Sequence, residues 1–114
     1  MVIRRNEMKI EQKEKMRDGE GTVTITHFVD GGSMQNARML AELSLPPKAS
    51  IGCHQHNNET EYFTFVSGTG VVNDNGREIP VKPGDVMVTG SGASHSVKNT
   101  GTETLVIHAV IVTH

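Results

Sequence analysis

The sequence predicts an all-β domain, either a sandwich or a barrel, on two observations. From Gly21 to the C-terminus, short runs of β-branched residues alternate with Gly, Pro, Asn and Asp, which is the pattern of strands joined by turns. No interval between these runs has the apolar spacing of a helix. The 114 residues, 35% of them hydrophobic, are enough for one modest core and too few for two domains of ordinary size.

The N-terminal stretch differs from the rest of the chain. Residues 6–18 are polar and charged, and their few apolar residues do not form a helical stripe. We expect a poorly ordered arm or a short helix there. The expected organisation is therefore an N-terminal arm over residues 1–20 and a barrel domain over residues 21–114.

Nine runs in the second part are predicted as strands, and turn chemistry sets several of their ends. Asn75 and Gly76 favour a tight hairpin, because both can adopt the positive φ that such turns need. Pro46 and Pro47 end the run before them, since proline cannot donate to a ladder. The predicted strands cover residues 22–28, 37–45, 50–56, 61–67, 70–73, 77–81, 86–89, 95–99 and 104–112.

Charge and cysteine usage bear on partners and location. The 13 acidic and 11 basic residues leave a formal charge of -2 without a basic block, which argues against a nucleic acid as partner. Cys53 is the only cysteine, so the chain can form no intramolecular disulfide. The N-terminus lacks the apolar run of a signal peptide, and we expect a cytoplasmic protein with no membrane partner.

The main chemical signal is a histidine pair within the run at residues 50–56. Alternate residues of a strand share a face, so the rings of His54 and His56 can converge on one ion at about 2.0 to 2.2 Å. Glu61 would add a carboxylate if it shares that face, and His95 would complete the set. Three imidazoles and one carboxylate suit first-row transition metals, and octahedral coordination leaves two positions for water or substrate. The alternative is a chance histidine pair on a solvent-facing strand.

The context of this pair resembles a known family. In the first stretch, one residue separates His54 from His56, four separate His56 from Glu61, and six separate Glu61 from Gly68. In the second stretch, five residues separate Gly84 from Gly90, one separates Gly90 from Gly92, two separate Gly92 from His95, and three separate His95 from Asn99. These spacings resemble both signature motifs of the cupin superfamily, whose members are small jelly-roll β-barrels. The resemblance implies a single-domain cupin barrel and the metal ligands His54, His56, Glu61 and His95. Gly90 stands where the second motif usually has proline.

The whole chain is similar to small single-domain bacterial cupins described as oxalate-decarboxylase-like. In the two-domain oxalate decarboxylases an arginine three residues before the first histidine binds the substrate carboxylate, and here that position is Ile51. The resemblance therefore implies the scaffold and one divalent metal more than the reaction. Manganese is the expected metal, with iron, nickel or zinc as alternatives.

Arg38 is a candidate for the missing anion-binding role. It belongs to the predicted strand 37–45, which we expect to line the barrel, and a guanidinium can grip an anion with two hydrogen bonds. The alternative is that Arg38 is exposed at the surface or pairs with Glu42 on the same strand.

Three classes of function remain open from the sequence. The first is a metal-dependent enzyme of the decarboxylase, isomerase or dioxygenase type, acting on a small carboxylate or a similar oxygen-rich metabolite. The second is a non-catalytic module that binds a small ligand or a metal. The third is a structural protein whose metal only stiffens the barrel. We also expect a homodimer, because the strands at residues 22–28 and 105–112 leave edges or apolar faces that a twofold partner can cover.

Three further residues have predicted structural roles. Cys53 alternates with His54, so we expect it to point away from the ligands as a small packing residue. Tyr62 should face the side opposite to Glu61. His108 either donates to the site or lies in the core, and we favour the core.

Overall fold

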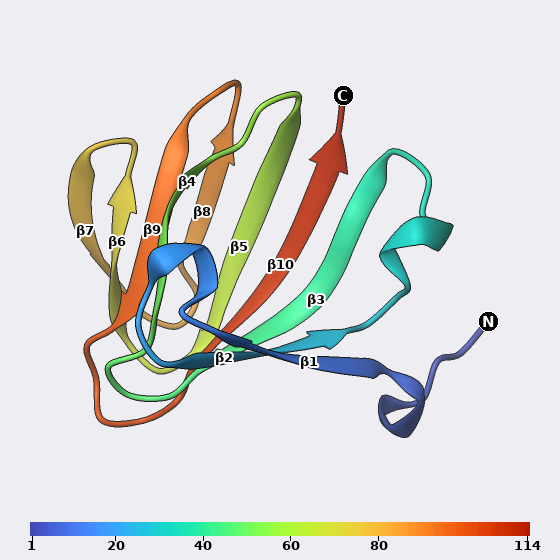
Figure 1. Cartoon of the computed structure of the whole chain (residues 1–114), viewed down its shortest axis with the longest axis horizontal. Helices are drawn as coiled ribbons and strands as arrows, with labels where there is room; N and C mark the ends of the chain where they lie inside the picture. Colours follow the sequence, from blue (N-terminus) through green and yellow to red (C-terminus); the bar gives the residue numbers. More distant parts are fainter.

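The computed structural model describes residues 1–114 and shows two antiparallel sheets packed face to face (Figure 1). The larger sheet has the order β1 (Lys9–Glu14), β2 (Thr22–His27), β3 (Ala37–Leu45), β10 (Leu105–Thr113), β5 (Glu59–Ser67) and β8 (Val86–Gly90). The smaller sheet has the order β4 (Ser50–Gln55), β9 (Ser94–Asn99), β6 (Gly70–Asp74) and β7 (Arg77–Val81). The predicted all-β jelly roll is confirmed, and all nine predicted strands are present with ends within two residues.

The N-terminal stretch forms a strand, so the expectation of a short helix or a poorly ordered arm is wrong. Strand β1 runs antiparallel to β2, from the pair Lys9–His27 to the pair Glu14–Thr22, and short 3-10 turns η1 (Arg5–Glu7) and η2 (Met16–Asp18) flank it. Nearly all of β1 is exposed, so it has no buried face and shows no apolar alternation. Ladder hydrogen bonds to β2 hold it in place. The boundary between residues 20 and 21 stays a prediction.

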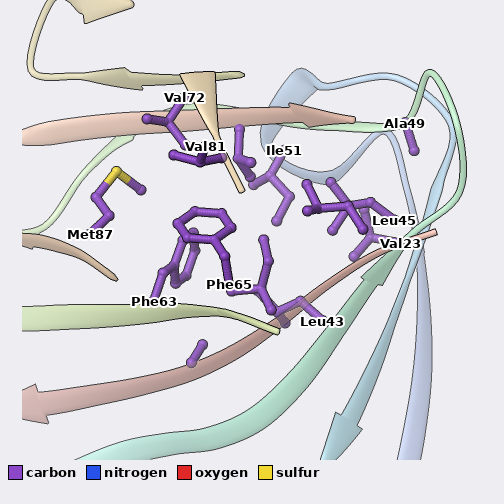
Figure 2. Close-up of a cluster of buried hydrophobic side chains, with 14 of the residues drawn as sticks. Val23, Leu43, Leu45, Ala49, Ile51, Phe63, Phe65, Val72, Val81 and Met87 are labelled. Carbon is purple, nitrogen blue, oxygen red and sulfur yellow. The ribbon is translucent and has the colours of Figure 1, made fainter. Parts of the chain in front are cut away.

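The core lies between the two sheets and is built from alternate residues of the strands other than β1 (Figure 2). Phe63, Phe65 and Leu43 come from the larger sheet, and Ile51 and Val72 come from the smaller one. The rings of Phe63 and Phe65 meet edge to face, with centroids 6.1 Å apart. Two aromatic rings therefore fill the centre of a core that is otherwise aliphatic.

One hairpin and two motif residues have structural reasons for their identity. Asn75 and Gly76 both have positive φ, 50° and 99°, and the predicted hairpin between β6 and β7 is confirmed. Gly68 has φ +79°, and a Cβ there would lie 2.5 Å from the backbone oxygen of Thr104, so only glycine fits. Buried Asn99 donates through Nδ2 to the carbonyl oxygen of Leu45 at 2.8 Å, which ties the end of β9 to β3.

The predictions for three single residues have different outcomes. Tyr62 is 39% exposed and faces away from buried Glu61, as expected. Cys53 is a free, exposed cysteine, so its predicted direction is confirmed but its packing role is wrong. His108 lies on the outer face of β10, and its side chain is 42% exposed. Side chains alternate along this strand, and the residues on either side of His108 are the buried ones. The core assignment of His108 is therefore wrong. The helical segments are all single short turns, and none has the length and apolar character needed to cross a bilayer.

Candidate metal centre

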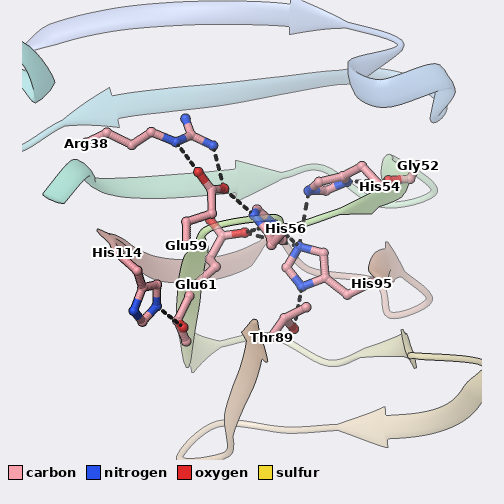
Figure 3. A network of polar contacts seen from close by, with 10 residues as sticks. Arg38, Gly52, His54, His56, Glu59, Glu61, Thr89, His95 and His114 are labelled. Atoms are coloured by element: carbon pink, nitrogen blue, oxygen red, sulfur yellow. Dashed lines mark hydrogen bonds and ion pairs between the residues drawn. The ribbon is translucent and has the colours of Figure 1, made fainter. Parts of the chain in front are cut away.

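Four polar side chains meet between the sheets near one end of the barrel (Figure 3). His54 on β4 and His95 on β9 are direct partners in the smaller sheet, and His56 follows at the end of β4. Glu61 reaches them from β5 in the larger sheet. One ligand atom from each residue lies within 4.8 Å of the others, and every member except half-buried His54 is buried. The structure thus brings together the four residues that the motifs indicated.

An irregularity in β4 aims the first histidine inward. Ile51 pairs with Val97 and His54 pairs with His95, so β4 has one more residue than β9 between these two pairs. The extra residue shifts the alternation, and both Ile51 and His54 then point between the sheets. Gly52, within this bulge, also allows the η2 turn to approach, because a Cβ there would lie 1.9 Å from the Arg17 backbone oxygen.

The protons of two imidazoles point away from the centre of the cluster. The His54 Nδ1 lies 2.8 Å from the carbonyl oxygen of Gly52, which can only accept, so Nδ1 carries the proton. The His56 Nδ1 lies 2.5 Å from the Glu59 carboxylate and donates to it for the same reason. The Nε2 atoms of His54 and His56 therefore both present bare lone pairs to the centre.

The remaining members of the cluster also present acceptors. Glu61 Oε1 lies 2.9 Å from the Nε2 of His56 and 3.1 Å from the Nε2 of His95. The His95 Nε2 lies 3.0 Å from that of His56 and 3.1 Å from that of His54. Its Nδ1 is 2.8 Å from the hydroxyl of Thr89, which can donate or accept, so His95 can carry its proton on either nitrogen. With the His95 proton on Nδ1, four acceptors face one point, and only a cation satisfies them all. The donor set fits a first-row transition metal.

The ionisation of the cluster also favours a cation. Burial alone would raise the pKa of Glu61, but the adjacent imidazoles of His56 and His95 outweigh this effect and lower that pKa. Burial lowers the pKa of His54, whereas the adjacent Glu61 carboxylate raises the pKa of His56. The Arg38 guanidinium lowers the pKa of Glu59 to about 2. Both carboxyl groups are therefore ionised at neutral pH and place negative charge around the centre.

Two residues at the centre, Glu59 and Thr89, were missed by sequence reasoning, whereas the core position of Phe63 follows from strand alternation. Glu59 lies two positions before Glu61 on β5, and strand alternation alone could have placed both on one face. Thr89 on β8 is the direct partner of Glu61 in the larger sheet, but a threonine in a strand carries no signal of its own. Phe63 stacks on the ring of His95 with centroids 5.0 Å apart, which joins the site to the core.

A small cavity of about 50 Å³ adjoins His54, His56 and Glu61. Two arginines line it together with apolar side chains from the core. One is Arg17, from the η2 turn, which forms no ion pair with a carboxylate. The other is Arg38. The N-terminal segment therefore contributes to the cavity wall, which the sequence did not indicate.

A bulge in β3 sets the position of Arg38. Strand β10 pairs Ile111 with Met39 and Val112 with Ala37, so Arg38 is left without a partner in the register. Bulges of this kind redirect a side chain, and Arg38 turns to Glu59 instead of lying beside Glu42. The predicted alternative of an Arg38–Glu42 pair is wrong, because Glu42 binds Arg5 at 2.6 Å. The Arg38 side chain is 45% exposed at the cavity mouth.

Comparisons with known proteins agree with this architecture. A family model described as a cupin domain matches residues 41–112. The oxalate-binding protein of Thermotoga maritima is 43% identical over 113 residues, which are 98% of this chain and 93% of that protein. A crystal structure of a predicted oxalate decarboxylase, also from T. maritima, has a TM-score of 0.93 at 41% identity and covers 100% of both chains.

A more distant structure shares only the fold. The polyketide cyclase RemF from Streptomyces resistomycificus has a TM-score of 0.75 at 19% identity, over 99% of this chain and 78% of that chain. Such a likeness says nothing about the reaction, because one fold hosts many activities. The family match over residues 41–112 and the relative at 43% identity carry the assignment. This chain is a member of the cupin family.

Proposed function

We propose that His54, His56, Glu61 and His95 bind one divalent transition-metal ion. The observation that carries this proposal is the convergence of imidazole lone pairs and an ionised carboxylate on one buried point. Manganese is the proposed metal, with iron, nickel and zinc as alternatives that the same donor set accepts. Four protein ligands in an octahedral arrangement leave two positions for a small molecule.

We further propose that the ligand is a small carboxylate or a similar oxygen-rich anion. A cavity of about 50 Å³ next to the cluster admits only a compact molecule, and two arginines on its wall favour negative charge. The relative at 43% identity is named an oxalate-binding protein, which makes oxalate the first probe. When bound, the metal would act as a Lewis acid toward a carboxylate or carbonyl oxygen.

We propose catalysis on this anion, of the decarboxylase, isomerase or dioxygenase type, as the function. The alternative is a binding module without turnover, which the name of the oxalate-binding relative favours. The experiment is calorimetric titration of oxalate into metal-loaded and metal-free protein, followed by an assay for carbon dioxide release. Binding with release supports the enzyme, and binding without release of carbon dioxide or another product supports the module. Absence of binding to loaded protein would refute oxalate as the ligand of this site.

We propose Arg38 as the anion-contacting residue of this site. Its guanidinium lies at the cavity mouth and uses two of its five N–H groups on Glu59. Replacing it with methionine should weaken oxalate binding by about 10-fold or more, because a hydrogen bond to a charged group contributes about 1.5 to 3 kcal/mol. Titration of loaded Arg38→Met measures this. Arg17→Met is the matched variant, and a loss there with none in Arg38→Met would transfer the role to Arg17.

We propose that the protein is a homodimer formed through the outer face of the larger sheet. Tyr62 and Val88 are cross-strand partners on that face, and with Val86 they are 39%, 55% and 60% exposed. Light scattering after size exclusion should give twice the chain mass for the wild type and a monomer for Val88→Glu. Val71→Glu adds the same charge on β6 of the smaller sheet, where Val71 alternates with buried Val72, and should remain dimeric. A monomeric wild type would refute the proposal.

The cytoplasm is the proposed location. The free, exposed thiol of Cys53 suits a reducing compartment, where unpaired cysteines persist. The net charge of -2 argues against a nucleic acid as partner. Cell fractionation that recovers the protein outside the cytoplasm would contradict this proposal.

A further inference from the structure

One carboxylate, that of Glu59, contacts both a member of the cluster and an arginine of the cavity mouth (Figure 3). Its Oε2 accepts the Nδ1–H of His56 at 2.5 Å and an Nη2–H of Arg38 at 2.8 Å. Its Oε1 accepts the Nε–H of Arg38 at 2.7 Å. The Glu59 side chain is only 14% exposed, so water competes little for these bonds.

We propose that Glu59 is a positioning residue that orients His56 for the metal and holds Arg38 at the cavity mouth. The inference rests on the proposed metal site, but its contacts belong to the protein itself. Glu59 is not among the four residues whose ligand atoms converge, and both of its oxygens are engaged by His56 and Arg38. It therefore acts through these two residues.

The effect on His56 follows from the tautomer. A neutral imidazole carries one proton, and a carboxylate beside Nδ1 keeps it there, which leaves Nε2 free as a ligand atom. The same bond fixes the rotation of the ring. Without the carboxylate, the proton can move to Nε2, where it blocks metal binding. Removal of such partners from ligating histidines typically reduces metal affinity by about 10- to 100-fold.

The effect on Arg38 follows from the bulge. Arg38 is the unpaired residue of β3 and its side chain is 45% exposed, so backbone geometry alone does not immobilise the long side chain. The two hydrogen bonds to Glu59 hold the guanidinium plane. The remaining N–H groups are free for an anion. Glu59 thus links the metal-ligand side of the cavity to its anion side.

The chain offers a matched control for this arrangement. Glu11 accepts a hydrogen bond from the His27 Nε2 at 2.6 Å, on strands β1 and β2 and outside the cluster. Glu11→Gln removes the same charge from the same kind of pair. Any general cost of breaking a carboxylate–imidazole contact therefore appears in this control as well.

The test compares wild type, Glu59→Ala, Glu59→Gln and Glu11→Gln in two measurements. Competition with a chelator for Mn²⁺ and Zn²⁺ should show about 10- to 100-fold weaker binding for Glu59→Ala and a smaller loss for Glu59→Gln. Glu11→Gln should match the wild type. Long-range ¹H–¹⁵N spectra of metal-free protein at pH 8 should show the His56 proton on Nδ1 in the wild type and partly on Nε2 in Glu59→Ala.

The outcomes separate this inference from the metal site itself. A wild type that binds no metal refutes the proposed site, while the tautomer measurement still tests Glu59. Unchanged metal affinity in both Glu59 variants, or an unchanged His56 tautomer in Glu59→Ala, would overturn the positioning role. If Glu59→Ala fails to fold, the isosteric Glu59→Gln carries the affinity comparison. The double variant Glu59→Ala, Arg38→Met should lose less binding free energy for oxalate than the sum of the two single losses, because Glu59 acts through Arg38. Fully additive losses would overturn that part of the role.

Discussion

The double variant His56→Ala, Glu61→Ala should retain no tightly bound metal when it is purified without added metal. The wild type should carry about one equivalent, measured by elemental mass spectrometry, because four donors converge on one point. Removing a histidine and the only carboxylate of the set deletes two ligands. The affinity should fall by far more than the 10- to 100-fold that loss of an outer partner causes.

Metal binding should also raise the free energy of unfolding of the protein. An ion that binds only the folded state at 100 times its dissociation constant adds about 2.7 kcal/mol to the free energy of unfolding. A chelator should therefore lower the Tm of the wild type and leave that of the double variant unchanged. The double variant His27→Ala, Glu11→Ala, outside the site, should behave as the wild type does. Equal metal content in both double variants would refute the metal centre.

Phe65→Ala should cause the largest loss of stability among the substitutions considered. The side chain is 1% exposed, belongs to the core between the sheets and packs edge to face on Phe63 (Figure 2). Truncating a buried phenylalanine typically costs about 3 to 5 kcal/mol, since the lost transfer energy is joined by a cavity. Small domains have only about 5 to 15 kcal/mol in total, so Phe65→Ala should be close to unfolding.

Denaturant unfolding of metal-free protein measures this cost apart from any metal contribution. Phe28→Ala is the control, because it removes the same atoms from a partly exposed ring that contacts His108 on the outer face. We expect the control to cost about 1 kcal/mol or less, as is usual for surface substitutions. A Phe65→Ala cost no greater than that of the control would show that the sheets do not depend on this ring for packing.

The strands after Gly21 and the four cluster residues were predictable because their signals are local. Alternation has a period of two residues, and turns such as Asn75–Gly76 need particular residue types, so both leave a pattern in a short stretch of chain. The histidine pair His54 and His56 shows its shared face in the same way. His95 lies far from this pair in the sequence, and it was joined to the ligand set through the resemblance to two motifs at once.

Other features depend on which strands become neighbours, and only the tertiary structure decided them. Strand β1 has no apolar face of its own and exists because β2 offers a free edge. The turn of Arg38 toward Glu59 results from a bulge against β10, and the contact of Thr89 with His95 joins strands of different sheets. Registers and bulges arise from the packing of the whole barrel, and no short run of residues encodes them. The ligand set was therefore readable in the sequence, whereas the residues that hold it in place became visible only once the two sheets were packed together.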